Sequence, residues 1–251
     1  MLLDTGTSEI PRGRWSEAQL YEQAYWQRLG DDMETGARAQ LDWYQWRATQ
    51  LQQRLGAIAE PRPRGGRILE IGSGPIGIVN FLEGDERYAV DPLEHFYQTR
   101  PSLVALRRPG VTYVDGTGER LPFEDASCSL VIIENVIDHT YAPEKILREI
   151  HRVLEPDGRL YLTVNVHTAW GAGLHAVLAA LRIDKGHPFT FTSGTLRPLL
   201  AASGFRVLRE QVEDYVQAKR TDCRSPRLKD KIKGYSGLSE FVHSVICSRV
   251  G

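Results

Sequence analysis

Cysteine is scarce in this chain of 251 residues, and the three cysteines lie far apart in the sequence. They are Cys128, Cys223 and Cys247, and no Cys-x-x-Cys pair occurs. An odd number at such wide spacing argues against a disulfide framework and against a cysteine-based zinc site. We therefore expect no bound metal and a reducing compartment, which we take to be the cytoplasm.

Long apolar runs are also missing. A helix that spans a bilayer needs about 20 apolar residues. The best candidate, residues 174–183, is shorter and contains His175 and Arg182. Residues 1–6 do not begin a basic region followed by an apolar core, so no signal peptide is evident. We expect a protein that does not insert into a membrane.

Neither sign of charge is in excess, because 31 Lys and Arg residues stand against 32 Asp and Glu residues. The net charge of -1 gives no bulk attraction to nucleic acid or to an anionic membrane. Apolar residues make up 41% of the chain, an ordinary share for a globular protein. We expect one large α/β domain with an appendage, present as a monomer or a homodimer.

A glycine-rich stretch at residues 67–82 organises the rest of the chain. An apolar run ends at Ile71, the glycines Gly72, Gly74 and Gly77 follow, and the next apolar residues have helical spacing. This order predicts a strand, a tight turn and a helix, which is how an α/β sheet forms a nucleotide pocket. Taken alone, the glycine spacing is also the dinucleotide fingerprint.

Two acidic residues indicate what this pocket binds. Glu70 lies two residues before Gly72, at the predicted strand end, where a carboxylate attracts a ligand amine and repels a pyrophosphate. Asp91 ends the next apolar run, about twenty residues past the glycine turn, where a carboxylate accepts hydrogen bonds from ribose hydroxyls. The alternative is that Asp91 only begins a turn with Pro92.

Three further segments follow in a fixed order. Residues 115–123 end in Leu-Pro-Phe, residues 136–143 carry a His before a Pro turn, and residues 152–158 read Arg-Val-Leu-x-Pro-x-Gly. With the glycine turn, they resemble the motifs of class I S-adenosylmethionine (SAM)-dependent methyltransferases. The resemblance implies a Rossmann-like α/β fold, with a mostly parallel seven-stranded sheet, helices on both faces and an N-terminal helical lid.

The same resemblance implies SAM as the cofactor and identifies the residues that bind it. Thr117 stands where the family has an Asp that contacts adenine, so Asp115 remains open as the substitute. The implied cofactor-binding residues are Glu70, Gly72, Ser73, Gly74, Asp91, Pro92, Thr117, Gly118, Glu134 and Asn135.

The resemblance also suggests how the chain is divided. Residues 1–60 are expected to form the helical extension, and residues 61–251 the SAM-binding domain, with substrate-binding insertions around 167–192 and 214–238.

Within the extension, helices are expected at about 16–29 and 37–55, and their many aromatic residues either pack on the sheet or cover a ligand. The basic stretch 219–233 indicates a solvated loop or, alternatively, a surface for an anionic partner.

His139 is our candidate for the catalytic base. It follows the apolar run at residues 127–135, the fourth predicted strand, at the edge where ligands bind, and imidazole can take a proton near neutral pH. Family members that methylate phosphobases pair a His here with a Tyr of the N-terminal helices, a role for Tyr21 or Tyr25. Substrate contact is predicted for Tyr25, His167 and His187. The alternative for His139 is a packing or supporting role.

The sequence thus predicts a SAM-dependent methyltransferase that acts on a small-molecule, glycan or lipid-precursor acceptor, at an oxygen atom. One alternative is a non-catalytic SAM-binding scaffold. Another is an NAD(P)-dependent oxidoreductase, which Glu70 and the Leu-Pro-Phe segment disfavour. A nucleic-acid methyltransferase is disfavoured because no Asn-Pro-Pro-Tyr-like motif follows the fourth strand.

Overall fold

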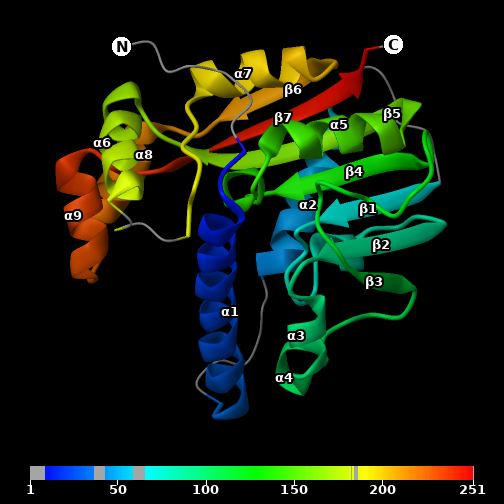
Figure 1. The fold of residues 1–251 in the computed structure, drawn as a ribbon, viewed down its shortest axis with the longest axis horizontal. Helices are drawn as coiled ribbons and strands as arrows, with labels where there is room; N and C mark the ends of the chain where they lie inside the picture. The colour runs from blue at the N-terminus through cyan, green and yellow to red at the C-terminus, as the bar shows by residue number, and fades with distance from the viewer. Residues whose placement is uncertain (1–8, 37–42, 59–65, 182, 184–185, 251) are drawn as a thin grey trace.

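The computed structural model describes residues 9–36, 43–58, 66–181, 183 and 186–250. Its centre is a seven-stranded sheet in the order β3-β2-β1-β4-β5-β7-β6, which lies between helices (Figure 1). The strands are β1 (Arg67–Ile71), β2 (Glu86–Asp91), β3 (Val111–Asp115), β4 (Cys128–Glu134), β5 (Leu154–Val166), β6 (Phe205–Val212) and β7 (Phe241–Arg249).

Five strands, β1 to β5, run parallel, and β7 runs antiparallel between β5 and β6. The central strand β4 is buried on both faces, as its apolar sequence predicts. Val131 and Ile133 join one core cluster, and Leu130 and Ile132 join the other. The predicted Rossmann-like fold is confirmed, and the carboxyl ends of the parallel strands meet at one edge.

Each core cluster belongs to a different layer of helices. On one face, α5 (Pro143–Val153) and α7 (Ser193–Ala202) contribute buried residues such as Ile146 and Leu196. On the other face, α2 (Trp43–Gly56) contributes Ala48 and Leu51. The N-terminal extension therefore supplies part of the core as well as the edge where ligands bind.

The helix predicted after the glycine turn does not form. Ile78–Phe81 make only a 3-10 helix, η1, and the chain is extended again at Leu82. The Glu70 carboxylate accepts the Val79 N–H, which holds the segment against the end of β1. Helix α2 already packs on Ile78 and Val79, so no second helix is needed to cover this part of the sheet.

Helix α1 (Arg12–Glu34) is longer than the predicted helix at 16–29, and it continues through Gly30, where we expected it to stop. Gly30 instead permits a close approach, because a Cβ there would lie 3.1 Å from Nη2 of Arg100. The Arg100 guanidinium pairs with Asp31 and Glu34 of α1. Residues 37–42 of the second predicted helix lie outside the described residues.

The basic stretch 219–233 is helical rather than a loop. It falls in α8 (Tyr215–Arg224) and α9 (Leu228–Ser236), which gather with α6 (Ala169–Ala180) at one end of the molecule (Figure 1). Asp214 begins α8 by accepting the Val216 N–H, and Gly237 ends α9 in the left-handed region, with φ 83°. Within the described ranges, no helix has the length and apolar character needed to cross a membrane.

Candidate active site

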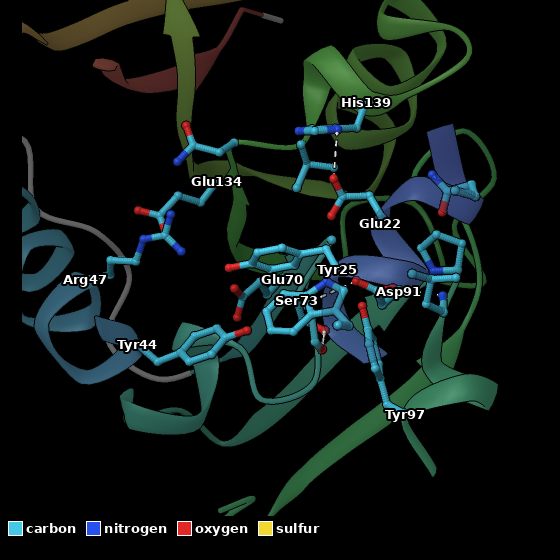
Figure 2. Close-up of a pocket in the computed structure, with 18 of the residues that line it drawn as sticks. Glu22, Tyr25, Tyr44, Arg47, Glu70, Ser73, Asp91, Tyr97, Glu134 and His139 are labelled. Carbon is cyan, nitrogen blue, oxygen red and sulfur yellow. Dashed lines mark hydrogen bonds and ion pairs between the residues drawn. The ribbon is translucent and has the colours of Figure 1, made fainter. Parts of the chain in front are cut away.

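A cavity of about 400 Å³ opens at the carboxyl ends of β1, β2 and β4. Helices α1 and α2 close it from the other side (Figure 2). Eight of the predicted cofactor-binding residues line it, together with the predicted base His139 and Tyr25. The eight are Glu70, Gly72, Ser73, Gly74, Asp91, Pro92, Glu134 and Asn135.

The glycine turn forms the floor of this cavity and tolerates no larger residue. Gly72 and Gly74 both lie in the left-handed region, with φ 69° and 61°. A Cβ on Gly72 would lie 2.3 Å from Cγ2 of Val136, and one on Gly74 would lie 2.6 Å from the Tyr44 hydroxyl. The turn is therefore held between the residues that follow β4 and the aromatic residues of the N-terminal helices.

Glu70 lies at the inner end of the cavity, almost completely buried. Its Oε2 atom accepts the Val79 N–H at 2.8 Å. Burial raises the pKa of Glu70 to about 8, against backbone hydrogen bonds that lower it. The carboxylate thus positions the backbone after the glycine turn, and its predicted contact with a ligand amine remains a prediction.

Asp91 ends β2 and connects two turns through its side chain. Oδ2 accepts the Gly74 N–H and Oδ1 accepts the Leu93 N–H, each at 2.8 Å. Burial raises the pKa of Asp91 to about 6, and these two hydrogen bonds oppose the rise. Each carboxylate oxygen can accept a further bond, so both remain able to bind a ligand from the cavity.

The segment predicted to contact adenine lies differently. Thr117, Gly118 and Asp115 are not part of the lining that the described residues form around the cavity. A Cβ on Gly118 would lie 2.8 Å from Ile71 Cγ2, so this glycine packs beneath β1. The Thr117 side chain hydrogen-bonds Glu119. The adenine contact of Thr117, or of Asp115 in its place, therefore stays a prediction.

Two charged residues of the N-terminal helices reach the site, and sequence reasoning missed both. Nε of Arg47, from α2, lies 3.1 Å from Oε2 of Glu134. Oε1 of Glu22, from α1, lies 3.6 Å from Nδ1 of His139. Figure 2 shows the two pairs on opposite sides of the cavity. No motif marks Arg47 or Glu22, and only the aromatic content of these helices pointed to a role at a ligand.

Glu134 and Asn135 lie where β4 ends and the chain turns away from the sheet. Burial raises the pKa of Glu134, and the Arg47 guanidinium opposes the rise. Asn135 has φ 53°, an uncommon conformation for a residue other than glycine. Such conformations persist where the surroundings impose them, which happens at functional sites.

Only some of the residues predicted to act on or contact the acceptor lie near the cavity. His139 lies in the cavity lining, and the His187 ring stands beside it with centroids 4.6 Å apart. His167 is buried farther along, stacked on His175, and burial lowers its pKa to about 4. Of the two tyrosines proposed as the partner of His139, Tyr25 lines the cavity and Tyr21 does not, among the residues that the structure describes.

Comparison with known proteins identifies the central part of the chain. Residues 69–162 match the family model of the methyltransferase domain. An uncharacterized protein of Mycobacterium tuberculosis is 31% identical over 160 residues, which cover 61% of this chain and 50% of that protein. The chain thus spans about half the length of the curated relatives it matches first.

Solved structures of low sequence identity share the fold. A putative sarcosine dimethylglycine methyltransferase from Galdieria sulphuraria gives a TM-score of 0.60 at 17% identity, over 84% of this chain and 86% of that one. A Haemonchus contortus phosphoethanolamine N-methyltransferase in complex with phosphomonomethylethanolamine and S-adenosylhomocysteine gives 0.54 at 16% identity, over 82% and 52%. With the domain match over residues 69–162 and the sheet order, these comparisons show a methyltransferase domain with the Rossmann-like fold of class I SAM-dependent methyltransferases.

Proposed function

We propose that this protein uses SAM to methylate a small-molecule, glycan or lipid-precursor acceptor, at an oxygen atom. The observation that carries the proposal is the single cavity that joins the glycine turn, Glu70 and Asp91 to His139. Its volume of about 400 Å³ falls in the range of cofactor sites, roughly 300–1,000 Å³.

The residues at the strand ends suit the cofactor. The left-handed glycines give a ligand close access to the backbone, and Asp91 offers carboxylate oxygens to ribose hydroxyls. Glu70 and Glu134 offer carboxyl groups where an amine and a sulfonium would lie, and a bound cation would favour their charged forms against the burial that raises both pKa values. Pro92 and Leu93 extend the lining past β2, where the adenine would rest.

SAM supplies an activated methyl group on a positive sulfur. Transfer would form a bond from the acceptor oxygen to the methyl carbon as the carbon–sulfur bond breaks, with the bonding pair left on sulfur, and His139 would help the hydroxyl proton to leave. The protein's task is to hold the two partners in line and to exclude water, a role for the aromatic residues of α1 and α2. His139 is our proposed group for activating the acceptor hydroxyl.

An amine acceptor is the competing proposal, and the two solved structures named above favour it because both carry names of methyltransferases that act on amines. A non-catalytic SAM-binding scaffold is a second competing proposal. The oxidoreductase alternative loses its basis, because the glycine turn belongs to a matched methyltransferase domain. A cytoplasmic location and a monomeric or homodimeric state remain predictions.

Calorimetric titration with S-adenosylhomocysteine, with NADH and NADPH in parallel, tests the cofactor. Micromolar binding of the sulfur ligand alone supports the proposal, and preferential binding of a dinucleotide refutes it. A screen of alcohol and amine acceptors with labelled SAM then tests the reaction. Transfer to amines only would overturn the oxygen assignment, and cofactor binding without transfer to any acceptor class would favour the scaffold.

A further inference from the structure

Asp138 and His139 place two electron-pair donors opposite each other without a proton between them. Both residues belong to η2 (Ile137–His139), the short turn after β4. Asp138 is only 3% exposed, and its Oδ1 atom has no hydrogen-bond partner within the described part of the chain. Nε2 of His139 lies 3.9 Å from that oxygen, beyond hydrogen-bonding distance.

The hydrogen bond of the other ring nitrogen of His139 determines which tautomer of the imidazole is present. Nδ1 lies 2.9 Å from the carbonyl oxygen of Gly186, which can only accept a hydrogen bond. Nδ1 therefore carries the proton, and Nε2 presents a lone pair to Asp138. A buried carboxylate oxygen that faces an imidazole lone pair is unfavourable unless a cation or a donor lies between them.

His187 supplies a third donor at the same place. One ligand atom from each of Asp138, His139 and His187 lies within 4.8 Å of the other two. A metal bound at about 2.0–2.2 Å from each ligand spans donor separations of roughly 3–4 Å, so small side-chain rotations complete the geometry. Two imidazoles and one carboxylate are a common ligand set for zinc and for other divalent transition metals.

The backbone around these residues is already fixed. The Phe189 N–H donates to the carbonyl of Asp138 at 3.3 Å, and the His167 N–H donates to the carbonyl of Phe191 at 2.9 Å. These two bonds attach the segment that carries His187 to η2 and to the end of β5. A histidine that ligates a metal typically donates its other N–H to a carbonyl or a carboxylate, as His139 does to Gly186.

We propose that Asp138, His139 and His187 bind one divalent transition-metal ion at the side of the active-site cavity. His139 lines that cavity, so an acceptor bound there would lie close to the ion. This inference rests on the proposed function in one respect only, the role of the ion. The ion would lower the pKa of a coordinated acceptor hydroxyl, whose proton would pass to solvent before the oxygen attacks the methyl carbon.

The proposal also specifies the acceptor. A hydroxyl oxygen that reaches both the ion and the methyl group suits this site, and a neighbouring hydroxyl or carboxylate on the same molecule would complete the coordination. In this arrangement His139 acts as a ligand of the ion in place of the base proposed above, and the acceptor proton passes to solvent.

Metal titration of the whole protein, stripped with a chelator and dialysed, tests the site without any acceptor. Calorimetry with Zn²⁺ should give one ion per chain, and Co²⁺ should give the visible absorption bands of a bound ion. Asp138→Asn and His187→Gln should each weaken binding at least tenfold, as loss of a ligand or its support does. His151→Gln is the matched control, because this histidine contacts Val250 at the far end of β7 and should leave binding unchanged.

The outcomes separate the two proposals. Absence of stoichiometric binding, or equal affinity in wild type and both site variants, overturns the metal site. Binding of S-adenosylhomocysteine to the same samples reports on the proposed function independently. If the ion binds and the sulfur ligand does not, the metal site stands and the methyltransferase function fails. Thermal unfolding of each variant confirms that a loss of binding is not a loss of fold.

Discussion

Replacement of Asp91 by alanine tests the cofactor site most directly. The side chain accepts two backbone N–H groups at 2.8 Å, from Gly74 and Leu93, and its oxygens still face the cavity. If both ribose hydroxyls also donate to it, each of these charge-assisted hydrogen bonds contributes about 1.5–3 kcal/mol. The loss of both amounts to roughly 3–6 kcal/mol, which is a 10²- to 10⁴-fold weaker affinity for S-adenosylhomocysteine.

The same substitution also affects the free protein, because it leaves two backbone N–H groups without their acceptor. Each such buried group costs about 1–3 kcal/mol of stability. Asp91→Asn is therefore the companion variant, since its amide oxygen still accepts one of the two bonds and its affinity should fall between those of alanine and wild type. Calorimetry is run well below the unfolding temperature of each variant.

Asp115→Ala separates the ribose contact from the adenine contact, because Asp115 pairs with Asp91 in register on the neighbouring strand β3. It is exposed and lies outside the described cavity lining. Asp115→Ala should keep the wild-type affinity if Thr117 makes the adenine contact. If Asp91→Ala binds S-adenosylhomocysteine as tightly as wild type while folded, Asp91 does not bind the ribose. If Asp115→Ala loses binding, Asp115 rather than Thr117 contacts the adenine.

Three further predictions concern Glu70, Gly74 and His139. The raised pKa of Glu70, about 8, makes the folded protein bind more protons than the unfolded chain. Its stability therefore falls as pH rises from about 5 to 8, by at most about 1.4 kcal/mol per pH unit. In Glu70→Gln the urea midpoint should depend less on pH over this range, and an unchanged pH dependence contradicts the raised pKa of Glu70. Gly74→Ala should lower the free energy of unfolding in urea by about 1–3 kcal/mol, because Gly74 has φ 61° and lies close to the Tyr44 hydroxyl. Gly173→Ala is the control, because Gly173 lies in a helix with open space around it, and this substitution should be neutral or stabilising. His139→Ala should spare S-adenosylhomocysteine binding and lower turnover about 10²–10⁴-fold, and a normal rate would refute any role of His139 with the acceptor.

The sheet could be predicted from the sequence because its strands carry their own signal. β4 is apolar on both faces, and Pro and Gly residues mark the turns between the strands and helices of a parallel sheet. The residues at the strand ends follow from the same order. Glu70 and Asp91 come to one cavity because parallel strands end at one edge.

The short η1 and the long α1 were not predictable, because tertiary contacts determine both. η1 depends on the Glu70 carboxylate and on α2, which belongs to a different part of the chain. The passage of α1 through Gly30 depends on Arg100, which fills the space of the missing Cβ. The spacing of glycines along the chain does not indicate either of these tertiary contacts.

The residues of the proposed metal site come from segments with no shared pattern, so no motif in the sequence indicated them. Asp138 and His139 are adjacent, but His187 reaches them only because residues 186–191 hydrogen-bond to η2 and to the end of β5. Glu22 arrives from α1 and lies 3.6 Å from the protonated nitrogen of His139, on the opposite side from Asp138. The helical extension therefore contributes to the chemistry of His139, since Glu22 and Gly186 both favour the tautomer whose free nitrogen faces the proposed ion.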